Sequence, residues 1–214
     1  MAKPIVWKNV AVDMQSTQGV LKNITAITKA STAVATSAGH GLANGDIIFL
    51  EVQGMRQLNE KAVRVAGVTT DTFQLEGVDS TRFDDFASGT AAKVTLGHPI
   101  TTATTISSSG GDFDFIDTTT IHDNAKSQVP GLPAATAFTM DHIFDPADLG
   151  LLALKDASDN QERRVFRFRF GNGGKILLFA GYVGCSLLPG GQAQQLITTR
   201  STMTLNGTPT YYSA

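Results

Sequence analysis

Residues 163–183 carry the pattern that most restricts the fold of this chain. They read RRVFRFRF, then the turn residues GNGG, then KILLFAGYV. Arginine and phenylalanine alternate, which places Phe166, Phe168 and Phe170 on one side of an extended segment, because side chains alternate along a β-strand. Glycine-rich residues between two such runs favour a tight turn. We therefore expect a β-hairpin, with a turn at 171–174, that buries a phenylalanine stripe.

The arginines on the opposite face allow two interpretations of the same strand. RNA-binding strands also combine basic and aromatic residues, but their aromatic rings are exposed and stack on bases. Here the partner strand is apolar as well, so a core would require these phenylalanines. We favour a core strand whose outer face, with Arg167 and Arg169, meets solvent or acidic groups of a neighbouring subunit.

The rest of the chain also favours strands. Only 17% of its 214 residues are charged, and Thr, Ser and Gly are abundant. A first strand is expected within 4–15. Closely spaced short strands between residues 22 and 95, with a turn at 44–46, predict a small β-barrel-like module. The segment 192–212 reads as one long strand followed by a turn at Asn206–Gly207 and a tail.

One helix is expected, over residues 145–160. Asp145 is suited to the N-cap and Pro146 to the first helical position, with Asp148 in the first turn. An apolar stripe would form from Leu149, Leu152 and Ala153, broadened by Leu151 and Leu154.

The segment 96–136 is polar, contains Gly and Pro, and shows no clear period. We expect a long loop, and a loop of this length in a compact domain is usually functional or disordered. Its DFDFID stretch could form one strand, with Phe113 and Phe115 on one face.

Motifs for catalysis are missing from the sequence. Cys185 lies in an apolar run and is expected to be a buried, inert thiol. The four histidines lack metal-ligand spacing, and His122–Asp123 fits a solvated loop better than a metal site. The net charge of −2 argues against a general electrostatic attachment to DNA or to an anionic membrane. We expect neither an enzyme nor a bound cofactor or metal.

The order of segments from about 136 to 210 resembles the lambda-type phage major tail tube family. The matching stretches are TAFTMDHIF, DPADLGLLALKDA, the aromatic hairpin with its F-A-G-Y-V return strand, and TLNGTP near the end. The opening VWKNVAVDMQST is also similar to tail tube proteins. Residues 23–95 resemble a different unit, the small FCCH-like β-module of ubiquitin-activating enzymes that recurs in phage tail proteins. Its hallmarks here include His40–Gly41, 44–46, Leu58–Asn59 and 77–80.

These resemblances imply a mainly β fold: a tail-tube β-sandwich or barrel with one flanking α-helix, plus an inserted β-barrel-like module. The tube domain would comprise 1–21 and 96–214, and the module 22–95. Excision of 22–94 would then leave a soluble tube domain. Such subunits form hexameric rings that stack into a hollow tube, in which inner sheets join into a continuous barrel.

The resemblance also implies partners, a location and interface residues. The partners are further copies of the chain, the tape measure, terminator and distal tail proteins, and DNA that passes without specific binding. A subunit made in the host bacterial cytoplasm would end in the virion tail of a siphophage-like particle. The long loop would bridge rings and become ordered only on assembly. The suspected subunit interface consists of Arg167, Arg169, Asp112, Asp114, His122 and Asp123.

Two other functions fit the sequence. The chain could be a minor distal-tail or baseplate protein that binds the host surface through the β-module. It could also be a tube-forming protein of a type VI secretion system, although the inserted module argues against this. Copy number in the virion separates the first alternative from a tube subunit.

Overall fold

The computed structural model describes residues 7–171 and 174–213. The centre of the expected 171–174 turn and the first residues of the expected opening strand lie outside these ranges. The described elements, in chain order, are β1 (Ala11–Gln18), β2 (Lys22–Ile24), β3 (Ala26–Ile27), β4 (Val34–Thr36), β5 (Ile47–Gln53), the 3-10 helix η1 (Arg56–Leu58), β6 (Lys61–Ala66), β7 (Thr72–Leu75), β8 (Ser88–Ile100), β9 (Ala103–Ser109), β10 (Phe113–Asp117), β11 (Gln128–Pro133), β12 (Ala137–Ile143), α1 (Leu149–Asp159), β13 (Arg163–Arg169), β14 (Ile176–Cys185) and β15 (Thr198–Tyr212).

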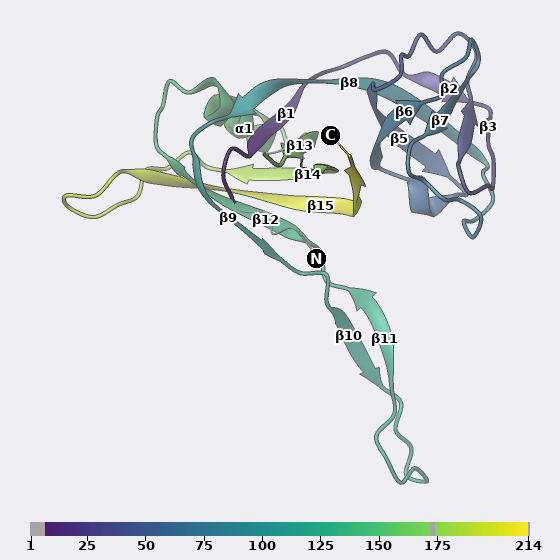
Figure 1. Ribbon diagram of the computed structural model, residues 1–214. Coiled ribbons are helices and arrows are strands. Elements are labelled where there is room, and N and C mark those ends of the chain that lie inside the picture. The colour runs from purple at the N-terminus through teal and green to yellow at the C-terminus, as the bar shows by residue number, and fades with distance from the viewer. Residues whose placement is uncertain (1–6, 172–173, 214) are drawn as a thin grey trace.

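The fold is mainly β, as expected, and one long sheet runs through most of it (Figure 1). The strand order is β3-β4-β7-β6-β5-β8-β1-β13-β14-β15-β12-β9, and β2 pairs with β8. The predicted hairpin is present as β13 and β14, which pair from Arg163–Tyr182 to Arg169–Ile176. Among the described residues, no helix has the length and hydrophobicity of a membrane span.

β8 belongs to both halves of the molecule. Its first part pairs with β5 of the module, and its second part pairs with β1. The strands within residues 22–95, which we call the module, gather at one end of the subunit (Figure 1), and through β8 they continue into the sheet of the body. The division into a tube domain and an inserted module stays a prediction.

Three apolar clusters stabilise the fold. The first packs α1 against one face of the sheet and contains Phe166, Phe168 and Met140. The second fills the module around Phe73 and Leu50. The third lies between the two halves and joins Phe49, Ala62 and Val94 to Val165, Leu178, Ala180 and Tyr212. The two halves thus pack against each other as the layers of a sandwich and are not independent domains joined only by a linker.

The helix begins later than the sequence predicted. Asp148 is the N-cap, and its carboxylate accepts a hydrogen bond from the Leu151 backbone N–H at 2.8 Å. Asp145 instead closes a turn by accepting from Ala147 at 2.9 Å, so the assignment of Asp145 to the N-cap was wrong. The buried stripe consists of Leu151, Leu154 and Ala157. Leu149 and Leu152 are exposed, so the predicted stripe was wrong at these two positions, because the face that packs on the sheet is the one that carries Leu151 and Leu154.

Two other local predictions need correction. Asn206–Gly207 does not end a strand, because β15 continues to Tyr212. Leu178 pairs with Thr210 and Ala180 with Asn206, so between these pairs one residue of β14 faces three of β15, and the two extra residues form a bulge with Gly207 at φ +71°.

The segment 96–136 is not a long loop. It contains the end of β8, all of β9 and the hairpin of β10 and β11, which projects from the body as an arm (Figure 1). We call residues 110–135 the arm. β10 corresponds to the strand that DFDFID suggested, whereas β11 escaped detection because both of its faces are largely exposed and no burial period marks the sequence.

Candidate assembly surfaces

The arm is held by its backbone rather than by a core. β10 and β11 pair from Phe113–Pro133 to Asp117–Gln128, with one register shift. At the base, Gly111 N–H donates to the Ala134 carbonyl at 3.0 Å and Ala134 N–H donates to the Asp112 carbonyl at 2.8 Å. An isolated two-stranded hairpin is marginal in water. This arm therefore has little stability of its own and would gain stability from a partner.

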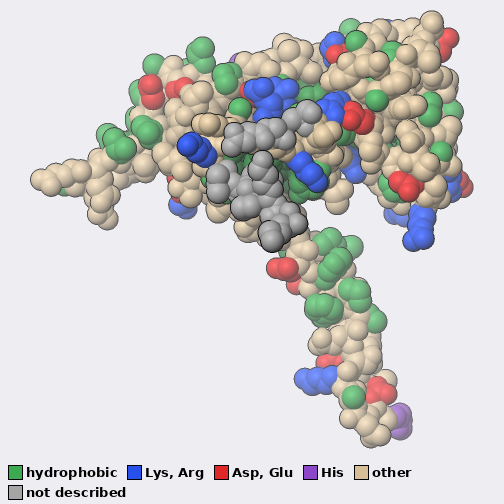
Figure 2. All heavy atoms as spheres, in the orientation of Figure 1, with side chains coloured by type: hydrophobic (Ala, Val, Ile, Leu, Met, Phe, Trp, Pro, Cys, Tyr) green, Lys and Arg blue, Asp and Glu red, His purple; other side chains and the backbone are tan. Residues whose placement is uncertain are grey.

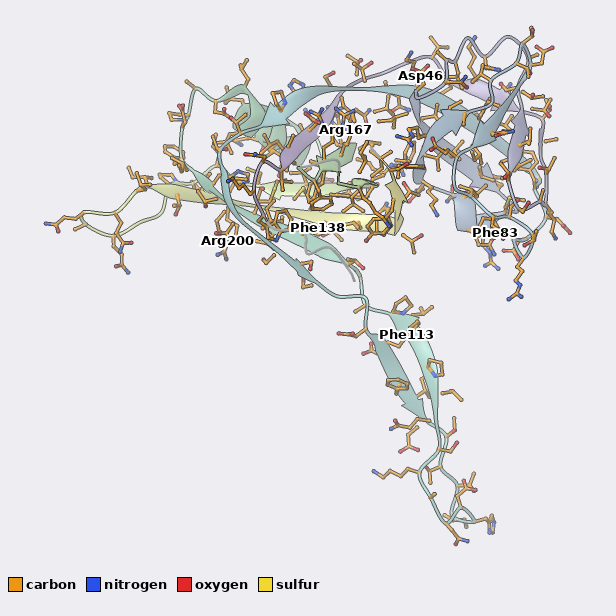
Figure 3. The ribbon with its side chains drawn as sticks, in the orientation of Figure 1. Asp46, Phe83, Phe113, Phe138, Arg167 and Arg200 are labelled. Atoms are coloured by element: carbon orange, nitrogen blue, oxygen red, sulfur yellow. The ribbon has the colours of Figure 1, made fainter. Side chains whose placement is uncertain are left out.

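Apolar side chains cover the half of the arm nearest the body (Figure 2). Phe115 is 63% exposed and Leu132 is 86% exposed, and further large apolar side chains are open to solvent at Phe113, Ile116 and Val129. Figure 3 shows Phe113 at the base of the arm, close to the body. A contiguous exposed apolar patch of this kind marks an interaction site.

The tip of the arm is polar and shaped by its own aspartates. Asp123 accepts hydrogen bonds from Thr120, from the backbone N–H at 2.7 Å and from the hydroxyl at 3.0 Å. Both bonds lower the pKa of Asp123, and the bond from the backbone N–H has the larger effect. Asp117 accepts from the Thr119 N–H at 2.8 Å in the same manner. His122 lies beside Asp123 at the exposed tip, and the described part of the chain holds no group of three or more potential metal ligands.

A buried carboxylate on the body holds the arginines of β13. Asp13 of β1 lies directly opposite Arg167 in the ladder and is 7% exposed. Its Oδ2 accepts from Arg167 Nη2 at 2.8 Å and Nε at 3.0 Å, and Arg169 Nε lies 3.2 Å from the same oxygen. From the sequence, Arg167 and Arg169 were expected to face solvent or acidic groups of a neighbouring subunit. Their acidic partner is instead Asp13 of the same chain. The pairing was missed because 154 residues separate Asp13 from Arg167.

A groove of about 660 Å³ opens next to this cluster, between β1, the end of β8 and β9. Val10, Val12 and Ile106 give it an apolar wall, and Arg169 and Asp13 line one side. Trp7 lies at its margin, with its ring 5.8 Å from that of Phe170. Figure 2 shows Lys and Arg side chains on the body close to where the arm leaves it.

The contact between the module and the body, which we call the seam, combines the apolar cluster with ion pairs and hydrogen bonds of defined geometry. Arg163 of β13 pairs with Glu51 and Glu60 of the module, each at 2.7 Å, and stacks over the Phe49 ring at 4.3 Å. Tyr212 accepts at its hydroxyl from the Arg64 backbone N–H at 2.9 Å. Such geometry fixes the orientation of the two layers.

Two side chains elsewhere that could in principle be reactive, Cys185 and His142, are both buried. Cys185 is buried, and burial raises the pKa of its thiol, which fits the inert thiol expected from the sequence. His142 is enclosed between Thr102 and Ser201, with ring nitrogens 3.2 Å and 2.7 Å from their hydroxyls. Burial lowers the pKa of His142, so it favours the neutral form.

A sequence model of the phage tail tube protein (TTP) family matches residues 53–214, which is more than half of the chain. The chain belongs to the phage tail tube protein family. The match includes the arm, α1 and the β13–β15 region, and it begins at the end of β5, inside the segment expected to be inserted. A search of curated proteins found no match.

Family membership establishes a structural role in the phage tail and a place in the virion tail. It also implies assembly of this tail tube protein with itself and with other tail proteins. The lambda-type subdivision and the likeness of 22–95 to the FCCH-like module stay predictions.

The six suspected interface residues fall into two groups. Arg167 and Arg169 lie on the body beside the groove, while Asp112, Asp114, His122 and Asp123 lie along the arm. Sequence reasoning missed Asp13 and most of the apolar residues of the arm, which DFDFID only partly signalled.

Proposed function

We propose that this chain is the repeating subunit of a siphophage-like tail tube, that six copies form a ring, and that stacked rings form the conduit for DNA ejection. The observation that carries the proposal is the arm, a hairpin whose apolar side chains have no partner among the described residues of its own chain. Tape measure, terminator and distal tail proteins would bind the inside and the ends of such a tube.

The arm and the groove complement each other in charge and polarity. Four aspartates of the arm, at positions 112, 114, 117 and 123, outnumber its single lysine, Lys126. The groove offers Arg169, which is half exposed and keeps free donors, beside an apolar wall. We place the arm of one subunit in the groove region of a subunit in the next ring, so that Asp112 or Asp114 approaches Arg169.

Apolar burial would supply most of the energy of this contact. Burying a Phe, Ile or Leu side chain is worth about 1.5–3 kcal/mol, so the arm offers on the order of 10 kcal/mol before the costs of association. An exposed ion pair adds only about 0–1 kcal/mol. The charges would therefore set the register of the contact rather than its strength.

A triple substitution, Phe113→Ser with Phe115→Ser and Ile116→Ser, tests the proposal. We expect a folded subunit that forms no tubes by negative-stain electron microscopy after concentration, whereas the wild-type chain forms rings or tubes. Val20→Ser with Leu21→Ser is the matched control, because these exposed apolar residues lie outside the arm. Tubes from the arm variant at wild-type yield would refute the assignment.

Host-surface binding through the module is the second candidate. It is favoured by the position of the module at one end of the body, where the arm does not cover it (Figure 1). Quantitative gel analysis of virions separates the two, because a tube subunit is abundant and a receptor-binding protein is scarce.

A further inference from the structure

The last part of β15 lies along the start of β6 at the seam, and contacts advance together along the two segments. Alternate residues of β15 each reach β6 or the residue just before it. These contacts join Asn206 to Glu60, Thr208 to Lys61, Thr210 to the Ala62 carbonyl and Tyr212 to the Arg64 backbone N–H. The side chains of Asn206 and Thr208 therefore meet neighbouring residues of the module.

Two consecutive residues of the module, Glu60 and Lys61, both reach β15 with their side chains. Consecutive side chains of a regular strand point to opposite sides. Glu60 directly precedes β6 and has φ +57°, a backbone conformation that few residues other than glycine adopt. This turn lets a carboxylate and an amine lie beside the same stretch of β15, where Asn206 contributes a carboxamide.

The carboxylate of Glu60 is oriented on the carboxamide of Asn206. Asn206 Nδ2 donates to Glu60 Oε2 at 2.8 Å. The other oxygen, Oε1, lies 2.7 Å from Arg163 Nη1 of the body. Arg163 thus fixes one carboxylate oxygen and leaves the second on the amide nitrogen, where it can exchange protons with that nitrogen.

The amine of Lys61 has the properties of a nucleophile. Burial lowers the pKa of this amine, which favours the neutral form with a free electron pair. Its described hydrogen bond goes to the neutral hydroxyl of Thr208, at 3.4 Å, which is long for such a bond. Rotation about the flexible four-carbon stem can carry Nζ from Thr208 to the side chain of Asn206, two residues earlier in β15.

We propose that Lys61 and Asn206 join in an isopeptide bond that links the module covalently to the body, with Glu60 as the proton carrier. The electron pair of Lys61 Nζ attacks Asn206 Cγ and forms the new C–N bond. Glu60 takes a proton from the attacking amine and passes it to Asn206 Nδ2. The Cγ–Nδ2 bond then breaks and ammonia leaves. One amide replaces another, so the reaction needs no oxidant, reductant or cofactor.

The bond would hold the seam closed. A covalent cross-link between distant residues stabilises the folded chain mainly because it restricts the unfolded chain. The reaction takes place within one subunit and requires neither a ring nor a tube. The inference therefore goes beyond the proposed function, and each can fail without the other.

Mass spectrometry of the full-length chain tests the proposal. We expect the folded wild-type chain to be lighter than its sequence by one ammonia. A tryptic digest should contain a branched peptide that joins the segments of Lys61 and Asn206. Lys61→Arg and Glu60→Gln should keep the full mass, because the first lacks the nucleophile and the second the proton carrier. Lys29→Arg is the matched control from the same module and should still lose ammonia.

Two results would overturn the proposal. The first is the full sequence mass in the folded wild-type chain, in free subunits and in any tubes that form. The second is loss of ammonia without a branched peptide. Asn206 precedes Gly207, and attack of the Gly207 nitrogen on Asn206 Cγ would release the same ammonia and form a cyclic imide. The wild-type digest alone distinguishes these outcomes, so the test holds even if a variant fails to fold by circular dichroism.

Discussion

Removing residues 22–94 tests whether the module is a separable insertion. Thr17 and Thr95 are direct partners in the β1–β8 ladder, so the remaining residues 18–21 could close a turn between them without moving either strand. Chain connectivity is thus no obstacle, and the outcome depends on the seam between the layers.

The seam predicts that the excised chain fails to fold. Val165, Leu178 and Tyr212 are each at most 4% exposed and pack against Phe49 and Ala62 of the module. Exposing three such side chains costs about 1.5–3 kcal/mol each, or about 5–9 kcal/mol together. Whole domains are stable by only about 5–15 kcal/mol. We therefore expect an aggregated or unfolded product, contrary to the soluble tube domain expected from the sequence.

Urea denaturation followed by circular dichroism, with size-exclusion chromatography, measures this effect. Phe49→Ala is the graded version and should lower the free energy of unfolding by about 3–5 kcal/mol, because it removes a buried ring and its contact with Arg163. Thr70→Ala, at an exposed site of the module, should change it by less than about 0.5 kcal/mol. The reasoning would be refuted if the excised chain were monomeric and unfolded cooperatively with the same urea midpoint as the wild-type chain.

Two further predictions concern buried polar groups of the body. Asp13→Ala should lower the free energy of unfolding by about 2–4 kcal/mol, because it leaves Arg167 without its buried partner, and Asp13→Asn should cost less; equal stability of Asp13→Ala and wild type in urea would contradict the pairing. Burial lowers the pKa of His142 in the folded chain, so the unfolded chain takes up the proton first as the pH falls below about 6.5. Stability should therefore be full above this pH and decline below it, by at most about 1.4 kcal/mol per pH unit from this group, and His142→Gln should show a smaller decline in the same titration.

The sequence predicted the elements whose local pattern and burial agree. The β13–β14 hairpin was recognised because Phe166 and Phe168 alternate with polar residues and glycines follow. The helix was found but misplaced, because Asp145 and Asp148 are both good caps and only the packing of Leu151 and Leu154 selects the second.

Features set by distant residues could not be predicted. The arm has no buried face, so β11 left no period in the sequence, and only β10 was suggested, by DFDFID. The Asp13 cluster and the seam depend on which strands become neighbours across more than 100 residues. The interface residues were named from a resemblance, and their grouping into a body set and an arm set became visible only in three dimensions.

The position of β15 has a consequence for the timing of synthesis. β12 and β9, which carry the arm, connect to the other strands of the sheet only through β15, and β15 follows every other described strand in the chain. A nascent chain that has not yet released β15 from the ribosome cannot dock the arm on the body. Among the described strands, the sheet can therefore be completed only near the end of translation, after β9, the arm and β12 have already been made.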